Sequence, residues 1–193
     1  MLKENALTTL ETVKRNLSNS ELDIDDELLT QKINEVSDFI ASYTDRRLEA
    51  ENYQEKYTGN NGRYLRLKQY PVSSLQSVQI NNTDIFLNEI DLYEDTGILY
   101  RDKLWPVCGS GRRNIVVNYE AGYILPKDHT EEKPRTLPYD LEGACIVMAT
   151  IKYQNRDAEG LTERRVGMDF TEKYLNDIPT SIKLILDLYK RRS

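Results

Sequence analysis

The chain has 193 residues, of which 39% are hydrophobic and 30% are charged, and its net charge at pH 7 is −6. A chain of this length can bury one core, and it has no apolar run of about 18 residues that would predict a membrane-spanning helix. The negative charge argues against a protein that coats nucleic acid, although it permits DNA to pass through an assembly.

Two further features concern where the protein is made. The first residues, 1–5, lack the apolar stretch of a secretory signal. Cys108 and Cys145 are too few and too widely spaced to indicate a disulfide framework. We therefore expect synthesis in a reducing cytoplasm.

Two helices are predicted in residues 1–50, because apolar residues recur there at steps of three and four. Asp23 or Asp25 is placed to cap the second helix, whose acidic start suits the positive end of the helix dipole. The apolar stripes are Leu7, Leu10, Val13 and Leu17 in the first helix and Leu29, Ile33, Val36, Ile40 and Tyr43 in the second.

The acidic start of the second helix also has some features of a calcium-binding loop. Asp23, Asp25 and Glu27 occupy alternate positions. An EF-hand, however, would need glycine where Leu28 stands and glutamate where Asn34 stands. We interpret these residues as helix caps and predict no metal site.

Residues 51–125 change from a helical to an alternating pattern, which predicts an antiparallel sheet. Asn61-Gly62 indicates a hairpin turn, Asn81-Asn82 a second turn, and Ile115–Val117 the clearest buried strand. Eight of the 13 tyrosines lie between Tyr53 and Tyr123. Tyrosine has an apolar ring and a polar hydroxyl, so it suits a partly solvent-exposed sheet or a subunit interface. Ordinary strand propensity explains the tyrosines equally well, and the sequence leaves both interpretations open.

After an exposed polar loop over residues 126–138, Pro138 suits the first turn of a third helix. Cys145 lies on the apolar face of that helix, so we expect a small core residue rather than a nucleophile. Residues 156–177 contain glycines and predict a loop with a short strand or a turn of helix. Pro179 begins the last helix.

The last helix has apolar residues on two sides. Ile182, Ile185, Leu186 and Tyr189 form one stripe, and Leu184 and Leu188 form a second. The second stripe predicts contact with another subunit or a wide contact with the core. The basic residues Lys190, Arg191 and Arg192 either complement the helix dipole or contact an acidic partner or DNA.

Signals for catalysis are weak. His129 lies in the polar loop and is expected to be a surface histidine. Gly109-Ser110-Gly111 lacks the wider nucleophile-elbow pattern, and Glu131-Glu132-Lys133 lies in a loop between prolines. The remaining acidic candidates for a divalent ion are explained equally well by solubility at a sheet edge. These acidic candidates are Asp91, Glu94 and Asp95. From the sequence as a whole we expect no catalytic residue, no metal and no cofactor.

Five short pieces occur in an order and spacing that span most of the chain. Together they resemble the head–tail connector (head-completion adaptor) family of tailed phages and prophages. The pieces are Tyr70-Pro71-Val72, Asp95-Thr96-Gly97-Ile98-Leu99, Val117-Asn118-Tyr119-Glu120-Ala121-Gly122-Tyr123, Pro138-Tyr139-Asp140-Leu141, and Ile178-Pro179 with the helix that follows to Tyr189.

The resemblance implies one connector domain over residues 1–193. It would comprise N-terminal helices (1–50), a β insertion (51–125), and C-terminal helices with a loop (136–193). We therefore expect an α+β fold that is mainly helical. It would be a small helical bundle that carries a tyrosine-rich antiparallel β insertion between the second and third long helices.

The resemblance also implies a non-enzymatic protein of the virion neck, assembled in the cytoplasm of the infected bacterium. Copies would form a ring, expected to be a dodecamer, that docks under the portal and receives the next neck or tail-completion protein. DNA would pass through without sequence-specific binding, and no membrane would be involved. The alternatives are a non-virion protein–protein interaction module of prophage or bacterial origin and a metal-dependent enzyme acting on DNA.

The resemblance finally implies that the terminal helix and the preceding loop reach the portal or neighbouring subunits. Its candidate residues are apolar or charged and have no evident role within the chain. They are Leu184, Leu188, Tyr189, Lys190 and Arg191 in the helix and tail, and Glu163, Arg164 and Arg165 in a candidate inter-subunit loop.

Overall fold

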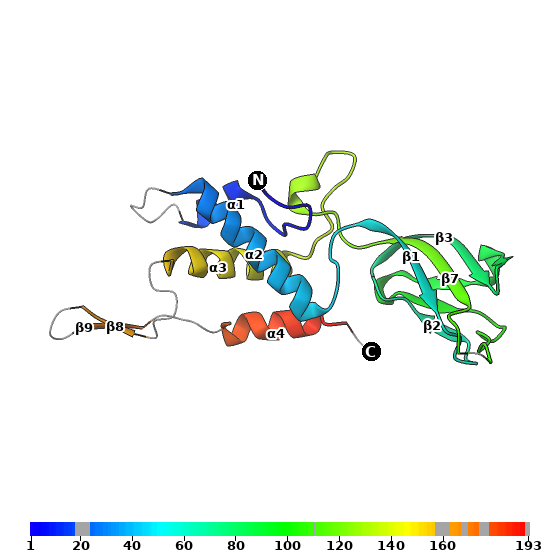
Figure 1. The fold of residues 1–193 in the computed structure, drawn as a ribbon. Helices are drawn as coiled ribbons and strands as arrows, with labels where there is room; N and C mark the ends of the chain where they lie inside the picture. The colour runs from blue at the N-terminus through cyan, green and yellow to red at the C-terminus, as the bar shows by residue number, and fades with distance from the viewer. Residues whose placement is uncertain (18–23, 110, 157–162, 167–169, 174–177, 192–193) are drawn as a thin grey trace. The chain divides into compact units, whose positions relative to one another are not determined.

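The computed structural model describes residues 1–17, 24–109, 111–156, 163–166, 170–173 and 178–191 (Figure 1). The chain divides into two compact units. The helical unit comprises Met1–Arg46 and Leu125–Ser193, and the β unit comprises Arg47–Ile124.

The helical unit is built on the second helix, α2, which contacts α1, α3 and α4. Within the described part of the chain, no helix is both long enough and apolar enough to cross a membrane. The helices are α1 (Leu10–Leu17), α2 (Asp26–Thr44), α3 (Tyr139–Gln154) and α4 (Thr180–Leu188), and the 3-10 helix η3 covers Pro126–Asp128. A two-stranded antiparallel hairpin, β8 (Glu163–Val166) and β9 (Phe170–Lys173), lies between α3 and α4 in the sequence.

The start of α2 confirms capping by Asp25. Its carboxylate accepts hydrogen bonds from the backbone N–H groups of Glu27 and Leu28, both at 3.0 Å. These bonds satisfy donors that a helix otherwise leaves unpaired at its first turn. The backbone N–H of Asp25 donates to the Tyr153 hydroxyl at 2.8 Å, which joins this cap to α3. Asp23, the other predicted cap, lies outside the described residues.

Cys145 is fully buried in the helical unit, as the apolar face of α3 predicted. Its sulfur lies 3.7 Å from the Ser37 hydroxyl, and burial raises the pKa of the thiol to about 12. Burial therefore disfavours the reactive thiolate at neutral pH. The Cys145 side chain packs in the core of the helical unit, which agrees with a small core residue rather than a nucleophile.

The two cysteines are expected to differ sharply in reactivity. Cys108 is only half-buried and neither cysteine is in a disulfide. A maleimide should add one label to the native protein, at Cys108, and a second label only after unfolding. Intact-mass measurement counts the labels, and Cys108→Ser should abolish labelling of the native protein. Rapid labelling of Cys145 in folded Cys108→Ser would contradict the buried position.

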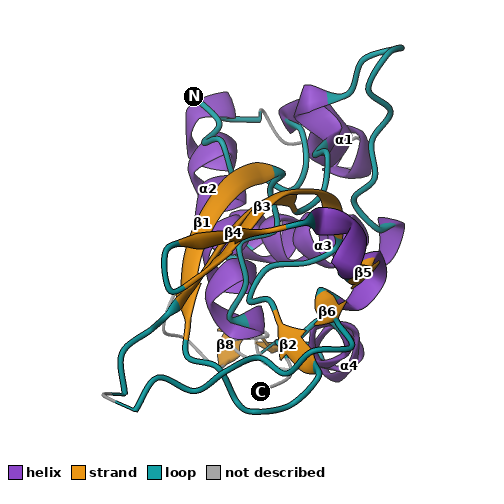
Figure 2. Cartoon of the chain, turned by 90° about the vertical axis from the view of Figure 1, so that its right-hand side faces the viewer, coloured by secondary structure: helices purple, strands orange, loops and turns teal. Residues whose placement is uncertain are grey.

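The β unit contains two antiparallel sheets, drawn as orange strands in Figure 2. The four-stranded sheet has the order β1-β7-β3-β4, with β1 at Glu51–Tyr57, β3 at Val72–Ile80, β4 at Thr83–Ile85 and β7 at Ile115–Ala121. The three-stranded sheet has the order β2-β6-β5, with β2 at Tyr64–Arg66, β5 at Asp91–Tyr93 and β6 at Ile98–Tyr100. The 3-10 helices η1 (Leu87–Glu89) and η2 (Glu94–Thr96) precede β5 and β6 respectively.

The β unit has a core of its own. Every second residue of β7 is buried, which confirms the strand predicted from Ile115–Val117. Trp105 is fully buried in this core, and its indole N–H donates to the Arg63 carbonyl at 3.0 Å. The guanidinium of Arg101 lies 5.2 Å from the Trp105 ring centroid. Strand alternation and a large aromatic residue together provide the buried apolar surface that a separate unit needs.

The predicted fold class was therefore partly wrong. The protein is α+β, as expected, but it is not mainly a helical bundle with a β insertion. Residues 47–124 form a compact unit because their alternating apolar residues pack against one another. The sequence pattern showed strands in this region but did not show how many would share a core.

One predicted turn was confirmed and another was not. Asn81 and Asn82 both have positive φ, at 52° and 65°, and connect β3 to β4 as expected. Asn61 also has a positive φ of 52°, but the strands beside it do not pair: β1 pairs with β7, and β2 pairs with β6. The Asn61 N–H instead donates to the Trp105 carbonyl at 2.9 Å. A contact distant in sequence thus replaces the local hairpin.

Candidate assembly surface

Helix α4 has one buried side and one exposed apolar stripe. Ile182 and Leu186 are buried in the helical unit, whereas Leu184 and Leu188 are 64% and 72% exposed. The two exposed leucines lie four residues apart, so they are neighbours on the helix surface. Among the described residues they take no part in a wide core contact. The second apolar stripe predicted for this helix is therefore available to a partner.

Tyr189 follows α4 and has partners within the chain. Its hydroxyl donates to the carboxylate of Asp140, with oxygen distances of 2.7 Å and 2.9 Å. Its carbonyl accepts a hydrogen bond from the Arg46 guanidinium at 3.2 Å. Tyr189 therefore joins the end of α4 to the start of α3 and to the residue that follows the cap of α2.

Lys190 and Arg191 also bind within the chain. The Lys190 ammonium lies 4.5 Å from the ring centroid of Tyr43 and 3.8 Å from the Asp187 carboxylate. The Arg191 guanidinium forms an ion pair with the Asp45 carboxylate at 2.5 Å, and the backbone N–H of Arg191 donates to the Thr44 carbonyl at 2.8 Å. The sequence had shown no evident side-chain partner within the chain for these two cations or for Tyr189, although it left open that the cations complement the helix dipole. They hold the C-terminal end of α4 against the end of α2, and their contact with a partner stays a prediction.

The pKa of Tyr43 is raised because its hydroxyl donates to Asp187, at 2.8 Å, and ionisation would place two negative charges together. This hydrogen bond is a further attachment of α4 to α2. Leu184 and Leu188 thus project from a helix whose orientation is fixed by several side chains.

Sequence reasoning missed Tyr139 as a candidate contact residue. It is the first residue of α3 and is 79% exposed, with the Arg135 guanidinium 4.1 Å from its ring centroid. The hydrogen bond between Asp140 and Tyr189 brings the start of α3 close to the end of α4. Tyr139 stands within one of the motifs of the family resemblance, which was the available signal.

The predicted inter-subunit loop is a strand. Glu163, Arg164 and Arg165 belong to β8, whose register pairs them with Lys173, Glu172 and Thr171 of β9 in that order. In the backbone described here, this hairpin forms a sheet separate from the two sheets of the β unit. Its role in contacts between subunits stays a prediction.

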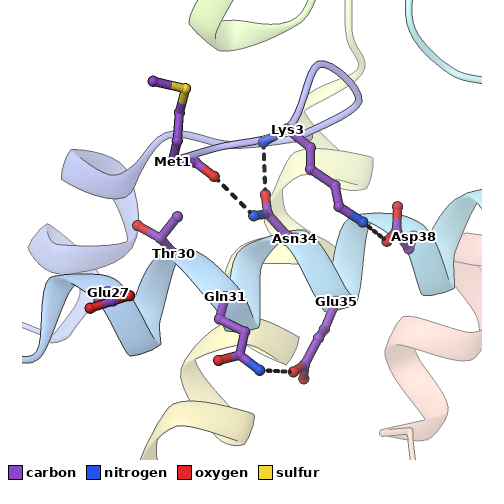
Figure 3. A pocket seen from close by; sticks show the side chains of 8 residues that line it. All are labelled: Met1, Lys3, Glu27, Thr30, Gln31, Asn34, Glu35 and Asp38. Atoms are coloured by element: carbon purple, nitrogen blue, oxygen red, sulfur yellow. Dashed lines mark hydrogen bonds and ion pairs between the residues drawn. The ribbon is translucent and has the colours of Figure 1, made fainter.

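A polar hollow of about 320 Å³ lies between the N-terminal segment and α2 (Figure 3). The backbone N–H of Lys3 donates to the Asn34 side-chain oxygen at 3.0 Å, and the Asn34 side-chain NH2 donates to the Met1 carbonyl at 3.2 Å. The Lys3 ammonium forms an ion pair with Asp38. This pairing lowers the pKa of Asp38, chiefly through hydrogen bonds from Lys3 and Asn5. These contacts fasten the N-terminal segment to α2.

The residues considered above for catalysis or metal binding lie in different elements. His129 is exposed, and its Nδ1 accepts the Arg135 backbone N–H at 3.1 Å, which is a loop-forming contact. Asp91 stands in β5, whereas Glu94 and Asp95 stand in η2. Across the described ranges, no group of three or more His, Cys, Asp or Glu residues is arranged to hold a metal ion. Ser110 of the Gly109-Ser110-Gly111 turn lies outside those ranges.

Solved structures with a similar fold come from gene transfer agent (GTA) particles. A chain from the neck of an empty GTA particle, computed with C6 symmetry, has a TM-score of 0.63 at 15% identity, with 100% of this chain and 96% of that chain covered. A chain from the virion of a native particle has a TM-score of 0.61 at 14% identity, with coverage of 100% and 93%. A third, from the neck of a native particle computed with C12 symmetry, has a TM-score of 0.56 at 15% identity, with coverage of 100% and 96%. These likenesses show the fold.

Sequence comparison provides the family. No curated protein matches the chain. The family profile described as "Head completion protein" matches residues 6–192, which is nearly the whole sequence. The chain therefore belongs to the head completion protein family, and this confirms the head–tail connector role expected from its sequence.

Proposed function

We propose that copies of this chain form a closed ring beneath the portal, extend the DNA channel and receive the next neck or tail-completion protein. The observation that carries this proposal is the exposed apolar stripe of Leu184 and Leu188 on a helix whose opposite side is core. A ring of twelve is expected, and it is supported by a fold similar to that of a neck chain solved with C12 symmetry.

A ring requires a heterologous interface, in which one surface of each subunit meets a different surface of the next. Leu184 and Leu188 would supply the apolar centre of such a contact, and the exposed ring of Tyr139 at the start of α3 is a further apolar candidate for an interface. The polar rim would include Tyr189, Lys190 and Arg191, which also hold the helix in place. Glu163, Arg164 and Arg165 would contact a neighbouring subunit or the portal.

The role is structural and requires no cofactor or catalysis. The net charge of −6 suits a channel wall that lets DNA pass without holding it or reading its sequence. Assembly would take place in the cytoplasm of the infected bacterium, and the ring would then remain in the neck of the virion. The portal is the partner on one side, and a neck or tail-completion protein is the partner on the other.

The double variant Leu184→Asp, Leu188→Asp is expected to abolish assembly while leaving the monomer folded. Burying each leucine contributes about 2 kcal/mol, so losing both should weaken each contact at least about 100-fold. Native mass spectrometry over a concentration series, with and without the portal, measures the assembly, and negative-stain images show whether a ring is closed.

Lys183→Asp is the matched control, because Lys183 is an exposed α4 residue that is not three, four or seven residues away from Leu184 or Leu188 and so lies off the apolar stripe. It should assemble like the original protein. Rings formed equally well by the double variant would remove α4 from the interface. A protein that stays monomeric even with the portal present would contradict the ring itself.

A further inference from the structure

Strand β1 forms one edge of the four-stranded sheet. It pairs with β7 along its full length of seven residues, from Glu51 to Tyr57. On its other side, no strand or loop of the described chain forms a backbone hydrogen bond with it. An unpaired edge of this kind is a ready template for another strand.

The direction of the free backbone groups follows from the ends of β7. The Gly122 N–H donates to the Pro71 carbonyl at 2.9 Å, and the Asn114 carbonyl accepts the Asn81 N–H at 2.8 Å, so both of these β7-flanking residues face β3. Successive residues of an antiparallel strand alternate in direction, and therefore Ala121 and every second residue before it face β1. Ala121 is paired with Glu51. The N–H and C=O groups that point outward from β1 are those of Asn52, Gln54 and Lys56.

This edge has few of the features that normally prevent strand addition. It contains no proline, its register with β7 has no bulge, and Lys56 is its single cation. The side chains of Gln54 and Lys56 are exposed, and Asn52 accepts a hydrogen bond from Gln76 at 2.6 Å. The outward amides of Gln54 and Lys56 are therefore open to a partner strand.

The same chain contains a hairpin that lacks a third strand. β8 and β9 pair with each other over four residue pairs and, in the described backbone, with no other strand. A hairpin of two strands is at best marginally stable in water, because it lacks a third strand or a helix to pack against. Addition to a longer open edge would supply that strand.

We propose that β1 is a strand-addition site and that its occupant is the β8–β9 hairpin of a neighbouring copy. The open edge on one subunit and the hairpin on the next are two different surfaces, as a heterologous ring contact requires. The site gives the predicted inter-subunit residues Glu163, Arg164 and Arg165 a partner surface. This inference rests on the proposed ring and adds main-chain pairing to the contacts of α4.

Gln54→Pro tests the edge directly. Proline removes an N–H that points away from β7, so the ladder within the subunit keeps its hydrogen bonds. Assembly in native mass spectrometry is expected to weaken at least tenfold, and the β unit should stay folded, as reported by the fluorescence of buried Trp105. Gln54→Ala is the matched control and should assemble normally, because it keeps the N–H and removes only the side chain.

A second variant tests the occupant. Replacing residues 163–173 by a glycine–serine linker of equal length should weaken assembly as much as Gln54→Pro does. The two changes combined should cost no more than either alone, because both remove the same contact. In the assembled original protein, hydrogen exchange should be slow at Gln54 and Lys56 as well as at Tyr53 and Glu55. In the linker variant it should become fast at Gln54 and Lys56 only.

Several outcomes would overturn the proposal. Rings that form normally from Gln54→Pro would exclude pairing at the β1 edge, and the ring would stand. Slow exchange at Gln54 that persists in the linker variant would show a different occupant. A protein monomeric under every condition, including with the portal, would overturn both the pairing and the ring.

Discussion

Glu142→Ala is expected to lower the free energy of unfolding of the helical unit by about 3 kcal/mol. The Glu142 carboxylate is buried in the first turn of α3, where it pairs with Arg135 and accepts a hydrogen bond from the Thr8 hydroxyl at 3.3 Å. Alanine would leave a largely buried guanidinium without its counter-charge, and such a loss typically costs 3–5 kcal/mol. The lower value is appropriate because the Arg135 side chain keeps 18% exposure and a hydrogen bond to the Leu137 carbonyl at 2.7 Å.

Denaturant titration followed by the helical circular dichroism signal measures this loss. Glu142→Gln should show about half of the effect, because the amide oxygen still accepts a hydrogen bond but carries no charge. Glu132→Ala is the surface control: Glu132 is exposed in the neighbouring loop, so its removal should leave stability unchanged. Equal stability of Glu142→Ala and Glu132→Ala would mean that the Arg135–Glu142 pair makes no net contribution.

Gly122→Ala is expected to destabilise the β unit by at least about 3 kcal/mol. Gly122 has a φ of +111°, which side-chain-bearing residues rarely adopt, and a Cβ would stand 2.1 Å from the Glu49 carbonyl oxygen. The clash is with backbone that is itself held: the Ala50 N–H donates to the Tyr123 carbonyl at 3.0 Å, and the Tyr123 N–H donates to the Leu48 carbonyl at 2.7 Å. Relief would therefore require breaking these hydrogen bonds, in addition to the cost of the strained φ.

Trp105 gives this prediction a specific readout, because it is the only tryptophan and lies in the core of the β unit. Its fluorescence transition should move to much lower denaturant in Gly122→Ala, whereas Glu142→Ala should mainly move the helical signal. Gly109→Ala is the control, since a Cβ at Gly109 would meet no atom within 4 Å. Coincident shifts of both signals in both variants would show that the two units unfold as one domain, as the sequence predicted.

The features that depend on local chemistry could be predicted from the amino-acid sequence. Apolar spacing predicted the helices, Asp25 stood where a cap was needed, and Asn81-Asn82 formed the predicted turn, because each involves residues only a few positions apart. The position of Cys145 in the core followed in the same way from the apolar face of one helix. The exposed stripe of Leu184 and Leu188 was also visible as a second helical spacing.

The packing of distant segments sets which of them share a core and which side chains remain available to a partner, and this was seen first in the folded protein. Asn61 has the positive φ of a turn, yet its N–H donates to the distant Trp105 carbonyl, and the flanking strands β1 and β2 join different sheets. Tyr189 and Arg191 looked unassigned in the sequence because their partners, Asp140 and Asp45, are far away along the chain. Hydrogen bonds and apolar burial between distant residues depend on the packing of the whole unit, and no local pattern encodes them.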